Sequence, residues 1–309
     1  MGKPFLFFAL LLFLFPDDAF SWGPGIHAMI SSSLCTASEI ISPLLKLISN
    51  FQKEFIWGSL MADMVIGKNL SNWAVHPHNW DFVFKIFEDA KTDKLKAFMI
   101  GYMTHLSHDV VAHNFLIPEM VILEALTKKN VLHEKNLLHL KIEINAENLV
   151  HIDVWKKIKD IQDTEDIRVC SEFIEDRLKS GLLSPKFSSI IFRRTIKVNA
   201  FKEFIKSKIR FNGDSKGKDV VIELVQGYVE MAYRSSENFL KRFDKSFCVK
   251  VDPTGMEPIG VSFALLNSIR EIKKKKGIVD ERKFFSALRH FQPSIFGKRT
   301  PVLDILNIS

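Results

Sequence analysis

The stretch KLKAFMIGYMTHLSHDVVAH, residues 94–113, decides the fold. Its apolar residues recur at three- and four-residue intervals, which is the period of an α-helix with a buried face. His105, Asp109 and His113 are four residues apart, so on a helix they drift by only about 40° per step and point from one face. Two imidazoles and a carboxylate on one face are good zinc ligands. The stretch therefore predicts a helix that lines a metal site.

A second pair of residues, His139 and Glu143, repeats the four-residue spacing on another expected helix. Apolar residues surround both sets, which places their faces inside a bundle, where facing helices build metal sites. The alternative is that these are core histidines with ordinary hydrogen-bond partners. That alternative explains either set well by itself, but it explains poorly why five such residues occur in two matching registers. His108 has no partner at four residues, and we expect it to support the structure or a ligand rather than the metal.

Helical periodicity continues along nearly the whole chain. It predicts helices over residues 28–48, 94–110, 118–127, 154–161, 173–179, 219–239 and 261–275. Strand-like alternation is rare, and glycine and proline gather at breaks between these segments. The sequence therefore predicts an all-α helical bundle over residues 22–248, followed by a helical C-terminal extension over residues 249–309.

The first 21 residues have the pattern of a secretory signal peptide. A lysine precedes an apolar run over residues 5–15, and Ala19-Phe20-Ser21 supplies small residues at a cleavage site. The run is short for a membrane span, and no later stretch is apolar enough to be one. We therefore expect a secreted or periplasmic protein that begins at Trp22, with an uncleaved N-terminal anchor as the alternative.

Composition adds two weaker indications. The formal net charge of +7 favours anionic partners such as phospholipid headgroups or nucleic acid. The three cysteines, Cys35, Cys170 and Cys248, allow at most one disulfide within the chain and fit no zinc motif.

Cleavage before Trp22 would create a metal ligand at the N-terminus itself. A free α-amine has a pKa of about 8, so a metal ion can displace its proton near neutral pH. The amine nitrogen and the carbonyl oxygen of Trp22 can then close a five-membered chelate ring, and His27 follows closely enough to be a third ligand. On its own, the Trp-Gly-Pro-Gly start is more typical of a simple turn before a helix.

The order of these residues resembles the zinc-dependent phospholipase C family, which includes phospholipase C/D-like proteins and, more distantly, secreted single-strand zinc nucleases. The resemblance rests on residues 22–150, and the helical pattern extends it to about residue 245. The matching positions, in chain order, are Trp22, His27, Asp63, His78, His105, Asp109, His113, His139 and Glu143.

The resemblance implies three zinc ions. Trp22, His27 and Asp109 would hold one ion, and His78, His105 and Asp109 its close neighbour, so Asp109 would bridge the two. His113, His139 and Glu143 would hold the third. Asp63 matches a family carboxylate that serves as ligand or general base, and His76 remains an alternative to His78.

Such a site supports phosphodiester hydrolysis by a metal-activated water, with Asp63 as the group that orients or deprotonates it. Nuclease relatives place five residues between the bridging Asp and the next His, whereas Val110, Val111 and Ala112 alone intervene here, and those relatives tend to have Asp where Glu143 stands. We therefore expect a phospholipid or related phosphodiester substrate. A zinc nuclease and a non-catalytic secreted zinc-binding or interaction protein are the alternatives.

The region after residue 151 carries no chemical motif. Its C-terminal phenylalanines, Phe284, Phe285, Phe291 and Phe296, are expected in the core, with peripheral contact to a membrane surface as the alternative.

Overall fold

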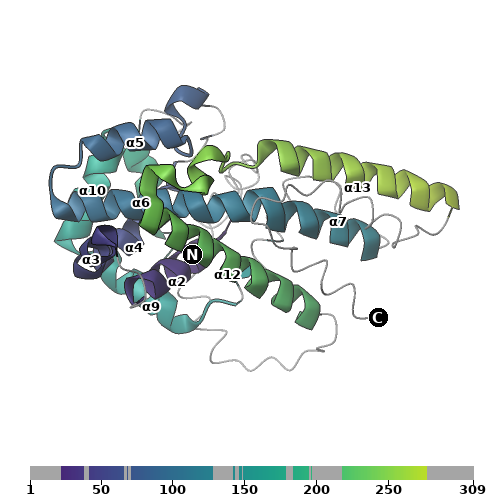
Figure 1. Ribbon diagram of the computed structural model, residues 1–309, viewed down its shortest axis with the longest axis horizontal. Coiled ribbons are helices and arrows are strands. Elements are labelled where there is room, and N and C mark those ends of the chain that lie inside the picture. Colours follow the sequence, from purple (N-terminus) through teal and green to yellow (C-terminus); the bar gives the residue numbers. More distant parts are fainter. Residues whose placement is uncertain are drawn as a thin grey trace, which may run out of the picture.

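The computed structural model describes residues 22–37, 42–65, 68, 71–127, 142, 146–147, 149–178, 184–194, 196 and 218–276. Within these ranges the chain forms helices and turns and no strand. The all-α helical bundle predicted from the sequence is confirmed (Figure 1). The predicted signal peptide and the last 33 residues lie outside the described ranges.

Helix α6 (Asp93–Val111) is the central element of the bundle. Thr92 caps its N-terminus by accepting from the Leu95 amide, and Asp93 lies in the first turn, where a carboxylate favours the helix dipole. Every residue from Ala97 to Val111 is buried. Figure 1 shows α6 running through the middle of the molecule, with α4 (Gln52–Met61), α5 (Trp80–Glu88) and α12 (Lys218–Arg242) around it. The helix that carries the metal-binding pattern is therefore inside the bundle.

Helices α4 and α6 approach each other at two glycines. A Cβ atom on Gly58 would lie 1.9 Å from the Phe98 carbonyl oxygen, and one on Gly101 would lie 1.9 Å from the Phe55 carbonyl oxygen. The two glycines thus let the two backbones meet directly. This close crossing brings the end of α4, where Asp63 follows, against the His105 region of α6.

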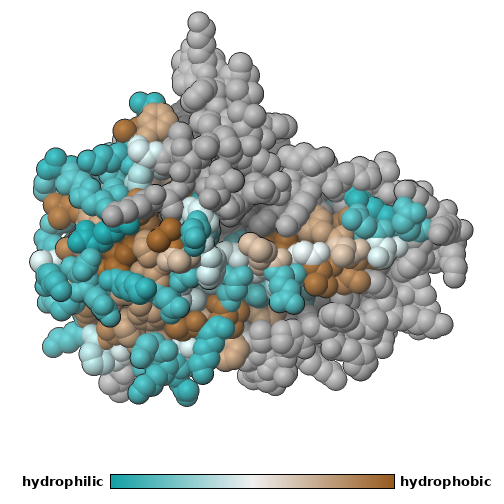
Figure 2. Space-filling model, turned by 90° about the horizontal axis from the view of Figure 1, so that it is seen from above, coloured by the Kyte–Doolittle hydropathy of each residue, from teal (hydrophilic) through white to brown (hydrophobic). Residues whose placement is uncertain are grey.

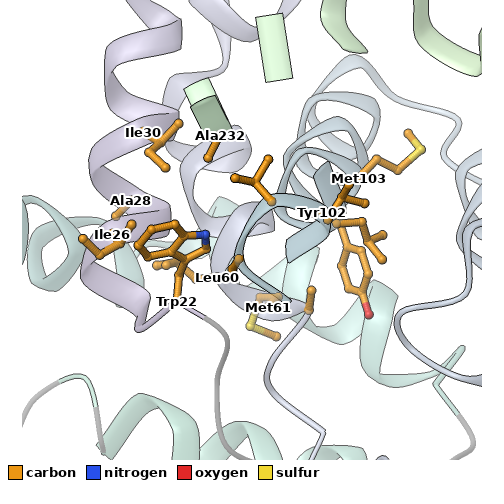
Figure 3. Packing of buried hydrophobic residues seen from close by; sticks show 14 of the residues in the cluster. Trp22, Ile26, Ala28, Ile30, Leu60, Met61, Tyr102, Met103 and Ala232 are labelled. Carbon is orange, nitrogen blue, oxygen red and sulfur yellow. The ribbon is translucent and has the colours of Figure 1, made fainter. Parts of the chain in front are cut away.

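The chain begins its described part with α2 (Pro24–Cys35), which packs on α4 and α12. Trp22, Ile26 and Ile30 are buried and lie among Leu60 and Ala232 from those neighbours (Figure 3). Pro24 occupies the first helical turn, where its missing N–H costs nothing. The mature start expected from the sequence is thus part of the core.

A single helix over residues 28–48 was expected, and that expectation was wrong. α2 ends at Cys35, and a separate helix α3 (Pro43–Asn50) begins at Pro43. The Ser42 side chain caps α3 by accepting from the Leu44 amide. Proline is tolerated in the first turn of a helix but disrupts its interior, so Pro43 marks a start.

The buried π-helical turn η4 (Ala112–Leu116) continues α6. Further described helices include α7 (Ile117–Thr127), α9 (Ile152–Gln162), α10 (Glu165–Glu175), α13 (Met256–Lys276), a helical segment over residues 185–194, and the short 3-10 helices η3 (Trp73–Val75), η5 (Phe243–Lys245) and η6 (Phe247–Lys250). Figure 1 shows α13 lying beside α7. The helix predicted over residues 173–179 is instead α10, which begins earlier.

Residues beyond 248 contact the bundle where the structure describes them. The Val251 carbonyl accepts from the Trp80 indole, and the Pro253 carbonyl accepts from His113. Gly255 has a positive φ of 54° and lies so close to His113 that a Cβ atom would clash with it. The division at residue 249 stays a prediction, but the described part of the extension packs on the main body.

The surface visible from above mixes hydrophilic and hydrophobic side chains (Figure 2). Trp73, on η3, is 47% exposed and is one of the largest exposed apolar side chains in the described residues. Among the described helices, none has the length and apolar character to span a bilayer.

Candidate metal centre

His105 and Asp109 lie one turn apart on α6 and face each other, as the four-residue spacing predicted. The distance from His105 Nε2 to Asp109 Oδ2 is 3.0 Å, and both side chains are fully buried. The Nδ1–H of His105 donates to the Ser59 carbonyl oxygen of α4 at 2.8 Å. This bond fixes Nδ1 as the donor and leaves Nε2 facing the carboxylate, an arrangement common among metal-binding histidines.

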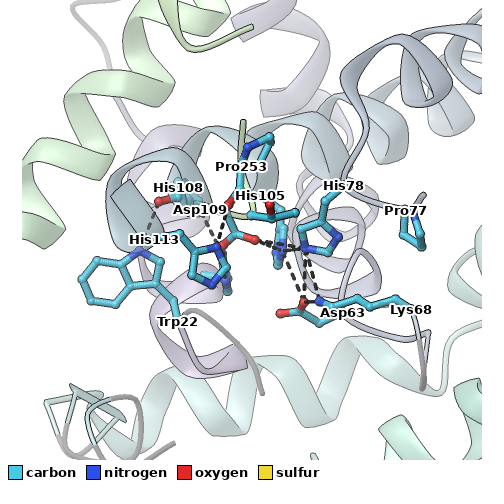
Figure 4. Close-up of polar contacts among 12 residues, drawn as sticks. Trp22, Asp63, Lys68, Pro77, His78, His105, His108, Asp109, His113 and Pro253 are labelled. Carbon is cyan, nitrogen blue, oxygen red and sulfur yellow. Dashed lines mark hydrogen bonds and ion pairs between the residues drawn. The ribbon is translucent and has the colours of Figure 1, made fainter. Parts of the chain in front are cut away.

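His78 reaches the same point from the turn between η3 and α5. Its Nε2 lies 3.0 Å from Asp109 Oδ2 and 3.3 Å from His105 Nε2 (Figure 4). The turn is held by the Tyr102 hydroxyl, which donates to the Pro77 carbonyl, and by Asn79, which caps α5. The loop is therefore anchored on both sides of the imidazole.

His76, the alternative to His78, does not reach the cluster. Its Nδ1 accepts from the His78 backbone amide at 3.1 Å, and its ring stacks on Trp73. The ring centroids of His76 and His78 are 5.7 Å apart. His76 therefore supports the turn that presents His78.

Asp63 completes the group from the turn after α4. Its Oδ1 lies 3.4 Å from His78 Nε2 and 3.6 Å from His105 Nε2. One ligand atom from each of Asp63, His78, His105 and Asp109 lies within 4.8 Å of the others. Zinc binds N and O ligands at about 2.0–2.2 Å, which gives tetrahedral edges of about 3.3–3.6 Å. The five separations that involve a histidine nitrogen, 3.0–3.6 Å, are close to these edges and suit a zinc site.

The electrostatics of the cluster favour a cation at its centre. Burial opposes the charge on His105, but the carboxylates of Asp109 and Asp63 raise its pKa to about 10. Burial likewise opposes the charge on Asp109, yet His105 holds the pKa of this carboxyl well below its ordinary value. Without metal, a proton on His105 balances the carboxylates. A divalent ion can take over that role.

A lysine that belongs to no recognisable motif also contacts this group. Lys68 Nζ lies 2.6 Å from Asp63 Oδ1 and 3.4 Å from His78 Nε2, and the residue is only 6% exposed. Lysine is not an expected zinc ligand, and a spacing of five residues from Asp63 follows no helical register. No signal in the sequence separated it from the other lysines.

His27 approaches Asp109 from the opposite side. Its Nε2 lies 3.5 Å from Asp109 Oδ1, its ring stacks on His105, and its Nδ1 lies 3.0 Å from His108 Nδ1. The two oxygens of Asp109 therefore face different histidines. His108, which we expected to support the structure or a ligand, contacts His27 through its ring.

The side chain of Trp22 is fixed close to these histidines. Its indole Nε1–H donates to the His108 carbonyl at 3.2 Å, and the residue is fully buried. Glu147 holds the following turn by accepting from the amides of Gly25 and Ile26, at 3.2 and 2.9 Å. These bonds keep the backbone of the Trp22 segment beside α6.

His113 does not join the four-residue cluster. It lies in η4, where the wider π-helical turn changes the register that an unbroken α-helix would give. Its Nδ1–H donates to the Pro253 carbonyl at 2.6 Å, and burial lowers its pKa, so the ring is neutral near pH 7. Its predicted partners, His139 and Glu143, lie outside the described residues.

Comparison with known proteins agrees with this geometry. A model of the zinc dependent phospholipase C family matches residues 26–209, which is more than half of the chain. The match contains the four clustered residues and His27. No curated protein and no solved structure matches the chain. The chain belongs to the zinc-dependent phospholipase C family and is therefore a zinc-dependent phosphodiester hydrolase.

Proposed function

We propose that this protein hydrolyses the phosphodiester of a phospholipid or a related compound, with zinc held by His78, His105 and Asp109 and with Asp63 as a further ligand or as the general base. The observation that carries the proposal is the convergence of four buried ligand atoms from the turn after α4, the η3–α5 turn and α6. The separations of these atoms suit tetrahedral zinc. Family membership supplies the class of reaction.

We further propose that Asp109 bridges two ions. Its Oδ2 faces His78 and His105, whereas its Oδ1 faces His27. His27 and the amine and carbonyl of Trp22 would hold the second ion. A third ion at His113, His139 and Glu143 completes the proposed set of three and rests on the family resemblance.

Bound zinc lowers the pKa of a coordinated water and offsets the negative charge of phosphate oxygens. Asp63 is the residue that we propose takes the proton of the attacking water or orients it. Burial opposes ionisation of Asp63, but Lys68 and His105 hold its pKa well below the ordinary value. Asp63 is thus anionic at neutral pH and can accept a hydrogen bond from water.

The proposal includes secretion with cleavage before Trp22. The burial of the Trp22 side chain and the anchoring of the next turn by Glu147 support it, because they hold the expected new N-terminus beside the histidines. A cleaved chain would offer its α-amine close to the proposed ion between His27 and Asp109.

The test uses protein that begins at Trp22, zinc, and vesicles of phosphatidylcholine. Appearance of water-soluble phosphocholine indicates cleavage on the C side, whereas free choline indicates the D side. Chelator should stop the reaction and added zinc should restore it. Single-stranded DNA is tested in parallel, and cleavage of DNA alone would favour the nuclease alternative.

A matched pair of variants connects the activity to the cluster. His105→Ala should lower the rate at least a hundredfold, because it removes a buried ligand. His151→Ala removes an exposed histidine at the start of α9 and should leave the rate unchanged. Equal activity in both variants, or zinc-loaded protein without hydrolysis of any phosphodiester, would reject the proposed site.

A further inference from the structure

Lys68 is a buried cation that the proposed metal centre does not need as a ligand. Lysine is almost never buried without a partner, because removing an ammonium group from water costs several kcal/mol. Here the side chain is 8% exposed, and its Nζ lies 2.6 Å from Asp63 Oδ1. The fold therefore places a positive charge, the Lys68 ammonium group, directly beside Asp63.

The position of the ammonium group relates it to the reacting centre. Figure 4 shows Lys68 extending to Asp63 and His78 at the edge of the cluster. Its Nζ lies 3.4 Å from His78 Nε2, one of the four atoms that fit a zinc ion. That nitrogen has one lone pair and cannot serve both Lys68 and a metal. With zinc on His78, an N–H of the ammonium group can turn to another acceptor beside the cluster.

The balance of charges indicates what that acceptor is. The carboxylates of Asp63 and Asp109 balance one divalent ion in the cluster. Lys68 makes the summed charge of the ion, the two carboxylates and its own ammonium group positive, and a second ion near His27 would add to it. A phosphodiester carries one negative charge spread over two non-bridging oxygens. Lysine binds phosphate oxygens as a point charge, so the excess matches the substrate.

We propose that Lys68 binds a non-bridging oxygen of the substrate phosphodiester beside the zinc cluster while it also holds Asp63. This inference rests on the proposed function of the same site. The recognised chemistry is the phosphate group itself, and the lipid part of the substrate is not required. Inorganic phosphate is therefore a sufficient probe.

The experiment compares zinc-loaded wild-type protein with Lys68→Met and Lys46→Met. Lys68→Met removes the charge and keeps an unbranched side chain. Lys46→Met removes a charge from the exposed face of α3 and is the matched control. Zinc content is measured on each sample, and inorganic phosphate is then titrated by calorimetry at fixed pH and ionic strength.

We expect Lys68→Met to keep the wild-type zinc content and to weaken phosphate binding at least tenfold. Lys46→Met should match wild type in both measurements. Lys68→Arg keeps the charge and should bind phosphate within about threefold of wild type. With a lipid substrate, Lys68→Met should raise KM more than it lowers kcat, which a merely structural role would not produce.

Three results would overturn the inference. Phosphate affinity in Lys68→Met within twofold of wild type would show that Lys68 does not contact the anion. More zinc in Lys68→Met than in wild type would show that the ammonium only competes with metal. Zinc-loaded wild-type protein that binds no phosphate would also reject it. If Lys68→Met does not fold, Lys68→Gln takes its place with the same expected loss.

Different results would reject the proposed function and the proposed role of Lys68. A wild-type protein without zinc, or one with zinc that hydrolyses no phosphodiester, rejects the function. Hydrolysis with normal phosphate binding in Lys68→Met rejects the role of Lys68 alone.

Discussion

At the scale of single residues, Asp109 connects the two sides of the proposed centre. Its Oδ2 lies 3.0 Å from both His78 and His105, and its Oδ1 lies 3.5 Å from His27. An amide at this position would have only one oxygen and could not coordinate both sides as a carboxylate does. Replacing the Asp109 carboxylate by an amide should therefore cost bound metal as well as activity.

We therefore predict that Asp109→Asn lowers the zinc content by at least one ion per chain. Asp81→Asn, on the exposed face of α5, is the control and should keep the wild-type content. Both are measured by elemental analysis after gel filtration. An Asp109→Asn protein with undiminished zinc would show that the bridging role was assigned to the wrong residue.

The protonation of His105 gives a second prediction, for stability in the absence of metal. The pKa of folded His105 is raised to about 10, above the ordinary value of 6.5. The proton therefore stabilises the metal-free fold fully below pH 6.5, and this stabilisation is lost as the pH rises toward 10. With zinc, His105 Nε2 holds the metal and has no proton to lose.

Thermal melting between pH 7 and pH 8.5 measures the difference. We expect the Tm of metal-free protein to fall by a few degrees over this interval and the Tm of zinc-loaded protein to change less. Buried cysteines, whose pKa values are also raised, affect both forms alike. Parallel curves for the two forms would contradict the proposed role of His105.

The residues of the site were predictable to different degrees. The four-residue spacing was sufficient for His105 and Asp109, because both lie on one regular helix. Asp63 and His78 lie in turns, where spacing carries no geometric information, and only the family resemblance pointed to them. His113 lies in the π-helical turn and outside the four-residue cluster, so its assignment to a third ion stays a prediction, and Lys68 gave no signal.

At the scale of elements, the crossing of α4 and α6 sets the position of the metal ligands. Gly58 and Gly101 allow each backbone to touch the other, and Ser59 next to Gly58 accepts from His105. A methyl group at either glycine has no space because the obstacle is a backbone carbonyl. Separation of the helices would move Asp63 and His105 apart.

We predict that Gly58→Ala lowers the free energy of unfolding by about 2 kcal/mol or more, because it overpacks a backbone contact. Gly260→Ala is the matched control: it lies in α13 with nothing within 4 Å, so alanine should stabilise that helix by up to about 1 kcal/mol. Urea unfolding of zinc-loaded protein measures both. Equal effects of the two variants would contradict the close crossing.

The periodicity of the sequence predicted the all-helical class, but it did not predict every individual helix. α4 has buried residues from Glu54 to Met61 on every side, so it lacks the one-sided pattern that reveals an amphipathic helix. It was missed, as was α5. The expected helix over residues 28–48 ignored the interruption at Pro43, which a local rule for proline would have caught.

At the scale of the whole molecule, the N-terminal segment closes the centre from the side of α2. Trp22 is buried and its indole bonds to the carbonyl of His108, while His108 contacts His27. If the free amine of Trp22 is a metal ligand, adding even one residue before Trp22 would move that amine away from the metal.

We predict that one extra methionine before Trp22 costs zinc and activity while the protein remains folded. Elemental analysis, activity and circular dichroism are compared with those of protein that begins at Trp22. The same zinc content and the same rate in the extended protein would remove the N-terminus from the proposed site. The cluster of Asp63, His78, His105 and Asp109 would be unaffected by that result.

The central claim is that the buried cluster binds zinc, and metal content per mole tests it most directly. Protein that begins at Trp22 is purified, its N-terminus is sequenced, and zinc is measured after removal of unbound metal. We expect close to three zinc ions per chain, with a loss of at least one in His105→Ala. Protein with the correct N-terminus that binds no zinc, even when zinc is supplied, would contradict it.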